Sequence, residues 1–214
     1  ARYICHEHAH LQQWQPPTAC QAALRELLAH RATLVRQRSA LAQAGCHNKA
    51  LARLDEPVLA AMQQAIAQID EQLASTVQAD PASQEAFEYI TSVPGLGLVC
   101  GSLLVMLFGR MQTRSADAVI AFTGLDPRPN DSGKKTGQRR LSKRGWPEIR
   151  RLMYTAAMSA ARTKTWNSFY RAQRDKGLST TAALVVLARK LLRVAFSLFK
   201  KRVKFDATLV AASA

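Results

Sequence analysis

The chain has 214 residues, of which 48% are hydrophobic, and it carries a formal charge of +15 at pH 7. This hydrophobic content excludes a disordered tail, and the sequence shows neither an uninterrupted apolar run of 18 residues nor an initial signal peptide. The charge is uneven, because residues 1–85 hold seven basic and eight acidic side chains, whereas residues 86–214 hold 23 and seven. We therefore expect a soluble intracellular protein whose second half binds a polyanion, with a basic membrane-surface protein as the alternative.

The first residues predict a connecting segment rather than a folded element. Residues 1–19 are polar, rich in histidine and end at Pro16-Pro17, which stops any preceding helix. We interpret them as a linker or as the remnant of an upstream domain. The chain starts at Ala1 rather than at methionine, so we expect it to be a fragment.

The cysteines give no indication of a metal site. Four of them are scattered along the chain without a Cys-x-x-Cys pair: Cys5, Cys20, Cys46 and Cys100. We expect reduced, buried thiols. Alternate histidines follow the first cysteine, at His6, His8 and His10, but this spacing suits neither one face of a helix nor the usual finger pattern. We predict no metal ligands in this chain.

Residues 20–80 predict a helical hairpin. Thr18 offers an N-cap for a first helix that ends at Gly45, and a second helix is expected with Pro57 in its first turn. Its apolar positions step by four, three and four residues, as in a coiled-coil seam: Met62, Ile66, Ile69 and Leu73. The two helices either form an antiparallel pair within one globule or dimerise. The narrow apolar stripes favour a coiled coil, and therefore a homo-oligomer.

A helix-hairpin-helix is predicted over residues 84–109. Ser83 is expected to cap a helix that runs to Ile90, and SVPGLG then leads into an apolar helix. Gly95 and Gly97 would let backbone N–H groups of the second helix approach a phosphate oxygen, where the helix dipole favours an anion. The alternative role for these glycines is tight helix–helix packing.

A basic loop is predicted over residues 124–146. Pro127, Pro129, Gly133 and Gly137 interrupt regular structure there, so we expect the loop to face solvent. Nine basic residues lie between Asp126 and Arg151, against three acidic ones. We predict that these side chains contact nucleic-acid phosphates: Arg128, Lys134, Lys135, Arg139, Arg140, Lys143, Arg144, Arg150 and Arg151.

The remaining segments also predict helices. Ser115 is expected to cap a helix over residues 116–122, and Pro147 to open one that runs to Ala161. Two more are expected over residues 167–176 and 182–200. The sequence contains no clear alternating strand pattern. We therefore predict an all-α fold, in which a helical hairpin or coiled coil precedes a compact helical domain.

This order of elements resembles a known family. Four parts carry the resemblance: the helical hairpin, SVPGLG, AFTGLDPRPNDSGKKTGQRRLSKRGWPEIRRLMYTAA and ALVVLARKLL. Together they resemble insertion-sequence transposases related to the Piv DNA invertase, a group that includes bridge-RNA-guided recombinases. The resemblance is strongest over residues 92–162. It implies that residues 81–214 form a transposase domain in which the loop 124–146 is catalytic. Ser132, in Asp-Ser-Gly, matches the nucleophilic serine of the family.

The resemblance also implies what this chain lacks. Relatives carry a RuvC-like domain with four acidic metal ligands, the last two just ahead of a stretch similar to Ala1-Arg2-Tyr3. We therefore expect that domain to be absent here, together with its Mg²⁺. The acidic residues of this chain should be surface charges rather than ligands: Glu7, Asp55, Asp70 and Asp117.

The reaction that the resemblance implies is cleavage of a DNA strand by Ser132, which gives a phosphoserine link. We expect a bacterial protein of the cytoplasm and nucleoid. Because nothing in this chain clearly removes the serine proton, we expect it to be inactive alone. Ser142 is the second choice of nucleophile, and capping of the following turn is its alternative role. DNA is the expected partner, with guide RNA as a further one. A non-catalytic nucleic-acid-binding module and an assembly subunit are the alternative functions.

Overall fold

The computed structural model describes residues 15–111, 115–128 and 140–208. Over these ranges the chain is almost entirely helical, which confirms the predicted all-α class. The elements are α2 (Ala19–Gly45), α3 (Lys49–Gln78), α4 (Pro81–Thr91), α5 (Leu98–Gly109), α6 (Ala116–Thr123), β1 (Pro127–Arg128), β2 (Arg140–Leu141), α7 (Pro147–Ala160), α8 (Lys164–Asp175) and α9 (Thr180–Lys201). None of the described helices is long and apolar enough to cross a membrane.

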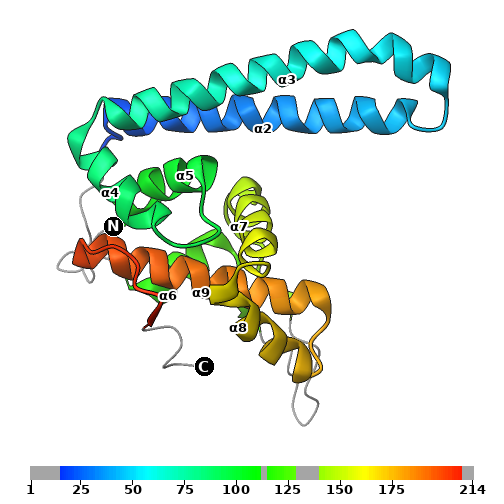
Figure 1. Cartoon of the computed structure of the whole chain (residues 1–214). Helices are drawn as coiled ribbons and strands as arrows, with labels where there is room; N and C mark the ends of the chain where they lie inside the picture. Colours follow the sequence, from blue (N-terminus) through cyan, green and yellow to red (C-terminus); the bar gives the residue numbers. More distant parts are fainter. Residues whose placement is uncertain (1–14, 112–114, 129–139, 209–214) are drawn as a thin grey trace, which may run out of the picture.

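Helices α2 and α3 form a long antiparallel pair that lies across one side of the molecule (Figure 1). Thr18 caps α2 as predicted, in a reciprocal capping box with Gln21. The predicted start of α3 was wrong, because the helix begins at Lys49, where the Asn48 side chain accepts bonds from two backbone N–H groups. Pro57 lies inside this helix and is exposed, so water can reach the backbone that its missing N–H leaves without a partner.

One end of the hairpin is embedded in the protein core and the other is exposed. Ile69, Leu73 and Val77 of α3 are buried in the same cluster as Leu24 and Leu28 of α2. At the far end, α3 leaves three large apolar side chains in solvent: Leu51 is 48% exposed, Leu54 73% and Val58 46%. The antiparallel pair therefore forms within one chain. Dimerisation through the hairpin stays a prediction.

Helix α5 is the centre of the fold. Every residue from Cys100 to Phe108 is buried, and the helix packs against α2, α3, α4 and α7. Its partner α4 begins after Asp80, whose carboxylate accepts bonds from the backbone and the hydroxyl of Ser83. Asp80, rather than the predicted Ser83, is therefore the N-cap. Pro81 at the first helical position explains the earlier start.

The C-terminal helices close the core from the other side. Helix α9 packs against α4, α6, α7 and α8, and its Phe196 ring lies 5.0 Å from that of Phe108 in α5. Helices α6 and α7 begin after Ser115 and at Pro147 as predicted. Helices α6 and α7 flank the two short strands in the sequence and position them.

Candidate nucleic-acid interface

A short antiparallel stem stands where the sequence analysis predicted only loop. Strands β1 and β2 pair Pro127 with Leu141 and Arg128 with Arg140. The stem brings together the two ends of the segment 129–139, which itself lies outside the described residues. The predicted nucleophile Ser132 therefore lies outside them too, as do Lys134, Lys135 and Arg139.

Hydrogen bonds at the base of the stem fix its register. The backbone N–H of Ser142 donates to the carbonyl of Asp126 at 2.9 Å, and that of Lys143 donates to the carbonyl of Gly124 at 3.1 Å. The Ser142 hydroxyl donates to the Asp126 carboxylate. Ser142 therefore joins the two sides of the stem base, a contact that neither of its predicted roles included.

Two glycines allow the chain segments to approach closely at this base. Gly124 has φ +71°, and a Cβ at this position would lie 2.0 Å from the carbonyl oxygen of Arg144. Gly145 has φ +96°, and its Cβ would lie 2.2 Å from the carbonyl oxygen of Phe122. Neither position accepts a side chain, because the obstructing atoms belong to the backbone.

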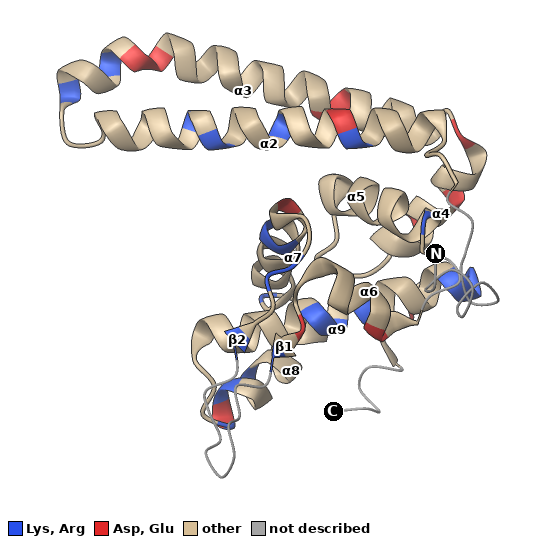
Figure 2. Ribbon diagram, turned by 180° about the vertical axis from the view of Figure 1, so that it is seen from behind, with Lys and Arg blue, Asp and Glu red and all other residues tan. Residues whose placement is uncertain are grey.

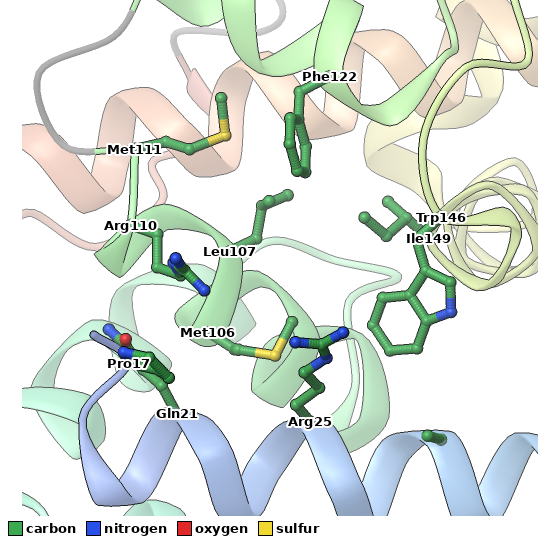
Figure 3. A pocket seen from close by; sticks show the side chains of 11 residues that line it. Pro17, Gln21, Arg25, Met106, Leu107, Arg110, Met111, Phe122, Trp146 and Ile149 are labelled. Carbon is green, nitrogen blue, oxygen red and sulfur yellow. The ribbon is translucent and has the colours of Figure 1, made fainter. Parts of the chain in front are cut away.

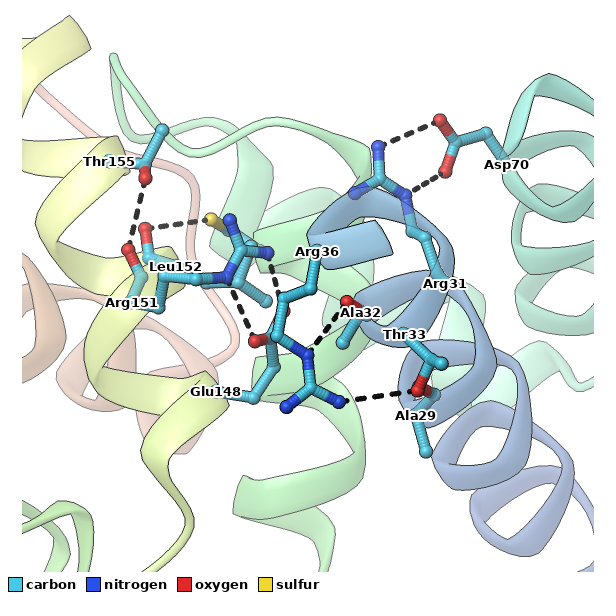
Figure 4. A network of polar contacts seen from close by, with 11 residues as sticks. Ala29, Arg31, Ala32, Thr33, Arg36, Asp70, Glu148, Arg151, Leu152 and Thr155 are labelled. Atoms are coloured by element: carbon cyan, nitrogen blue, oxygen red, sulfur yellow. Dashed lines mark hydrogen bonds and ion pairs between the residues drawn. The ribbon is translucent and has the colours of Figure 1, made fainter. Parts of the chain in front are cut away.

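Arg150 and Arg151 stabilise this region through contacts within the protein. Arg150 donates to the carbonyl oxygens of Thr123 (3.2 Å), Arg144 (3.4 Å) and Gly145 (3.2 Å), which ties α7 to both sides of the stem base. Arg151 donates to both carboxylate oxygens of the buried Glu148, at 2.8 and 2.5 Å (Figure 4). The hydrogen bonds that Arg151 donates to Glu148 raise the pKa of Arg151. Their predicted contact with phosphate stays a prediction.

Four predicted DNA-binding cations surround the described part of the stem. Arg128, Arg140, Lys143 and Arg144 are all exposed. Figure 2 shows basic residues on β1 and β2 and on the neighbouring helices α8 and α9. Helix α8 and its C-cap residue add further exposed cations, namely Lys164, Arg171, Arg174 and Lys176. Such a cluster on one surface suits a polyanion.

The α4–turn–α5 unit has the predicted order of elements, and its two glycines differ in their surroundings. Gly95 has φ +100°, and a Cβ there would lie 2.6 Å from the Cβ of Ala160 in α7. This contact corresponds to the packing alternative. Gly97 is exposed at the N-terminus of α5, and a Cβ there would meet nothing within 4 Å. Phosphate binding by this unit stays a prediction.

The acidic residues that we predicted to be plain surface charges include two in ion pairs. Asp70 accepts two bonds from Arg31, at 2.6 and 3.0 Å, and Asp117 pairs with Arg193. Within the described ranges, no group of three His, Cys, Asp or Glu side chains has a geometry that fits a metal ion. The sequence Cys5, His6, His8, His10 lies outside those ranges.

Cys100 is a buried thiol behind the site. Burial raises its pKa to about 11, so the thiol is protonated at neutral pH. Its sulfur lies 3.6 Å from the carbonyl oxygen of Leu152 in α7, to which the thiol donates. Cys20, Cys46 and Cys100 are free cysteines. The expectation of a buried thiol is confirmed for Cys100 and was wrong for Cys46, which is exposed.

Comparisons with known proteins match the region that contains this site. The profile of the Transposase IS116/IS110/IS902 family matches residues 87–171. The chain is 30% identical over 146 residues to the insertion element IS116 uncharacterized 44.8 kDa protein of Streptomyces clavuligerus, covering 67% of this chain and 36% of that protein. It is 30% identical over 130 residues to the insertion element IS900 uncharacterized 42 kDa protein of Mycobacterium paratuberculosis, covering 59% and 33%.

A third relative matches over most of this chain. The pilin gene-inverting protein of Moraxella lacunata is 23% identical over 214 residues, covering 96% of this chain and 65% of that protein. The chain therefore spans about a third of the two insertion-element proteins and 65% of the third relative.

Proposed function

We propose that this chain, whose residues 87–171 match the profile of the Transposase IS116/IS110/IS902 family, is the DNA-contacting and nucleophile-bearing part of a transposase or recombinase. The observation that supports this most directly is the stem that joins α6 to α7 within the matched region. It presents exposed cations next to the ends of the segment that contains Ser132.

The stem is suited to hold phosphates in a fixed place. Backbone hydrogen bonds, two glycines with positive φ and the Arg150 contacts fix the base of the stem, so the exposed cations lie on a rigid support. We assign the phosphate contacts primarily to Arg128, Arg140, Lys143 and Arg144. We assign Arg150 and Arg151 to the support of the stem base, because their guanidinium groups already have partners in the protein.

The proposed reaction is attack of the Ser132 hydroxyl oxygen on the phosphorus of a DNA phosphodiester. A serine–phosphorus ester bond forms, one phosphorus–oxygen bond to a sugar breaks, and the released sugar hydroxyl takes up a proton. The phosphoserine link retains an ester bond, so a second sugar hydroxyl can displace the serine and rejoin strands. Nearby cations stabilise the negative charge that develops around phosphorus.

Activation of the serine needs a group that removes its proton. The resemblance to the Piv-related transposases assigns metal chemistry to an upstream domain with acidic ligands and Mg²⁺, and we propose that cleavage requires that domain. No step is assigned to a metal on the described residues, where no suitable cluster of ligands occurs. A guide RNA remains a proposed additional partner.

The decisive experiment is to trap a covalent protein–DNA adduct. A full-length relative with the upstream domain, incubated with its cognate DNA and Mg²⁺, should form an adduct that resists denaturing electrophoresis. Replacing the serine that corresponds to Ser132 by alanine should abolish the adduct and leave DNA binding nearly unchanged, because a hydroxyl contributes little beside several cations.

The matched control is Ser142→Ala. This variant loses the hydroxyl bond to Asp126 but keeps the backbone bond between the same two residues, so the adduct should still form. An adduct that vanishes only in Ser142→Ala would contradict the choice of serine. Normal DNA binding without any adduct in the unmodified protein would favour the non-catalytic binding module instead.

A further inference from the structure

A cavity of about 700 Å³ lies between the helical hairpin and the base of the stem. Its walls come from α2, α5, α6 and α7 and from the residue that precedes α7. Figure 3 shows the rings of Phe122 and Trp146 and the guanidinium groups of Arg25 and Arg110 around the same space. The cavity lies outside the stem and its phosphate-binding cations.

The lining combines apolar and aromatic surface with positive charge. Phe122 is 52% exposed, although it is a large aromatic side chain, and Met106 adds a polarizable thioether. Arg25 and Arg110 supply two cations, and none of the described residues that line the cavity is acidic. This combination suits a flat aromatic group that carries negative charge at its edge. It does not suit a cation or a purely aliphatic ligand.

The position of the cavity relates it to the nucleic-acid interface. Trp146 follows Arg144 by two residues, so their Cα atoms are at most about 7.6 Å apart. A strand whose phosphate contacts Arg144 therefore has its adjacent base within reach of Trp146 and Phe122.

We propose that this cavity binds an unpaired nucleobase of a DNA strand whose backbone lies on the stem, a proposal that rests on the DNA-binding function above. The base stacks on the rings of Phe122 and Trp146, and the neighbouring phosphates lie near Arg25 and Arg110. Stacking of this kind tolerates every base, because each has an aromatic face, so the site selects an unpaired nucleotide rather than a sequence.

The test compares three DNA probes with the same flanking sequence: a fully paired duplex, a duplex with one unpaired base, and a duplex whose extra nucleotide is abasic. Fluorescence anisotropy of the full chain should show about 10-fold tighter binding to the unpaired base than to the other two probes. The abasic probe separates recognition of the base from recognition of a bent backbone.

Variants at the cavity assign the preference to its residues. Phe122→Ala and Arg25→Gln should each reduce the preference for the unpaired base to about 2-fold and leave the affinity for the paired duplex nearly unchanged. The matched controls are Met158→Ala, at an apolar side chain that is 41% exposed on α7, and Arg53→Gln, near the far end of the hairpin. Both controls should keep the full preference.

The possible results separate the two proposals. If no probe binds, the DNA-binding function itself fails. If all three probes bind equally, or if the preference survives both cavity variants, the nucleobase site is overturned while DNA binding stands. If Phe122→Ala changes the sedimentation of the chain but not its choice among probes, the cavity holds a second copy of the chain and the proposal is wrong. Circular dichroism confirms that each variant is folded.

Discussion

At the scale of single residues, Glu148 is a buried charged residue near the stem. It is only 8% exposed, and its carboxylate accepts two bonds from Arg151. This carboxylate lies in the first turn of α7, where the helix dipole also favours negative charge. Glu148 therefore links the first turn of α7 to Arg151, one turn later in the same helix.

We predict that Glu148→Ala lowers the free energy of unfolding by about 1–2 kcal/mol, because it leaves the Arg151 guanidinium without its carboxylate. The loss is modest because the Arg151 side chain is 38% exposed, so water replaces part of the interaction. Asp117→Ala breaks the more exposed pair with Arg193 and should cost less than about 1 kcal/mol. Urea denaturation measures both. A larger loss in Asp117→Ala would contradict this ranking.

Cys100 predicts a dependence of stability on alkaline pH. Burial raises the pKa of its thiol from 9.0 to about 11 in the folded state, so the unfolded chain releases this proton first. The contribution is fully present below about pH 9 and is lost as pH rises through 11. It amounts to about 3 kcal/mol. Cys100→Ala should flatten the decline in unfolding free energy between pH 9 and 11, whereas Cys46→Ala, at an exposed thiol, should leave it unchanged.

At the scale of elements, the turn between α4 and α5 contains two glycines, and only the first has no room for a side chain. Gly95 combines a positive φ with a close approach to Ala160, and Gly97 has an extended backbone and open space around it. The packing of α4 and α5 against α7 therefore depends on the first glycine. The second is available for a ligand at the N-terminus of α5.

We predict that Gly95→Ala costs about 2–4 kcal/mol of stability, from backbone strain and from displacement of α7. Gly97→Ala should change stability by less than about 0.5 kcal/mol. Thermal and urea denaturation test both values. Weaker DNA binding by Gly97→Ala would support a phosphate contact at the N-terminus of α5. Unchanged binding would leave the turn a purely packing role.

The sequence predicted most helices because their signals are local. Thr18, Ser115 and Pro147 mark helix starts through bonds or backbone angles within one turn, and the structure places helices after or at them. The start of α3 was missed because Pro57 was taken as a first-turn proline, although Asn48 caps the helix nine residues earlier. A proline can occupy the first turn of a helix or, where the surrounding backbone is exposed, its interior.

The site was less predictable because its geometry depends on contacts distant in sequence. The β1–β2 stem has two residues in each strand, too few for an alternating pattern. The bond from Ser142 to Asp126 joins residues 16 apart, and that from Arg150 to Thr123 joins residues 27 apart. The sequence indicated the basic composition of this surface. It did not indicate which cations support the stem and which face solvent.

At the scale of the whole molecule, the uneven charge predicts a steep salt dependence of DNA binding. Each phosphate neutralised contributes about −0.9 to the slope of log affinity against log salt. Arg140→Glu combined with Arg144→Glu should make this slope shallower by about 2. The matched double variant Arg36→Glu with Arg53→Glu changes the net charge equally on the hairpin and should leave the slope nearly unchanged. Equal effects would show that net charge, rather than the stem, determines binding.

The exposed end of the hairpin predicts self-association of the full chain. Leu51, Leu54 and Val58 lie on one stripe of α3 at spacings of three and four residues, where a second copy can cover them. We expect Leu54→Glu to shift the chain from dimer to monomer in analytical ultracentrifugation. Met158→Glu, at an exposed apolar residue on α7, is the control. A chain that is monomeric at high micromolar concentration without any substitution would contradict the prediction.

The hairpin also has a mechanical consequence, because one end is anchored in the core and the other is exposed. Helix α2 has 27 residues and is therefore about 40 Å long. A partner held at the tip is thereby kept at a set distance from the DNA-binding surface, comparable to about 12 base pairs of duplex. The length of the hairpin therefore sets this distance. Seven residues added to each helix would lengthen the hairpin by about 10 Å, or roughly three base pairs, and leave its buried end unchanged.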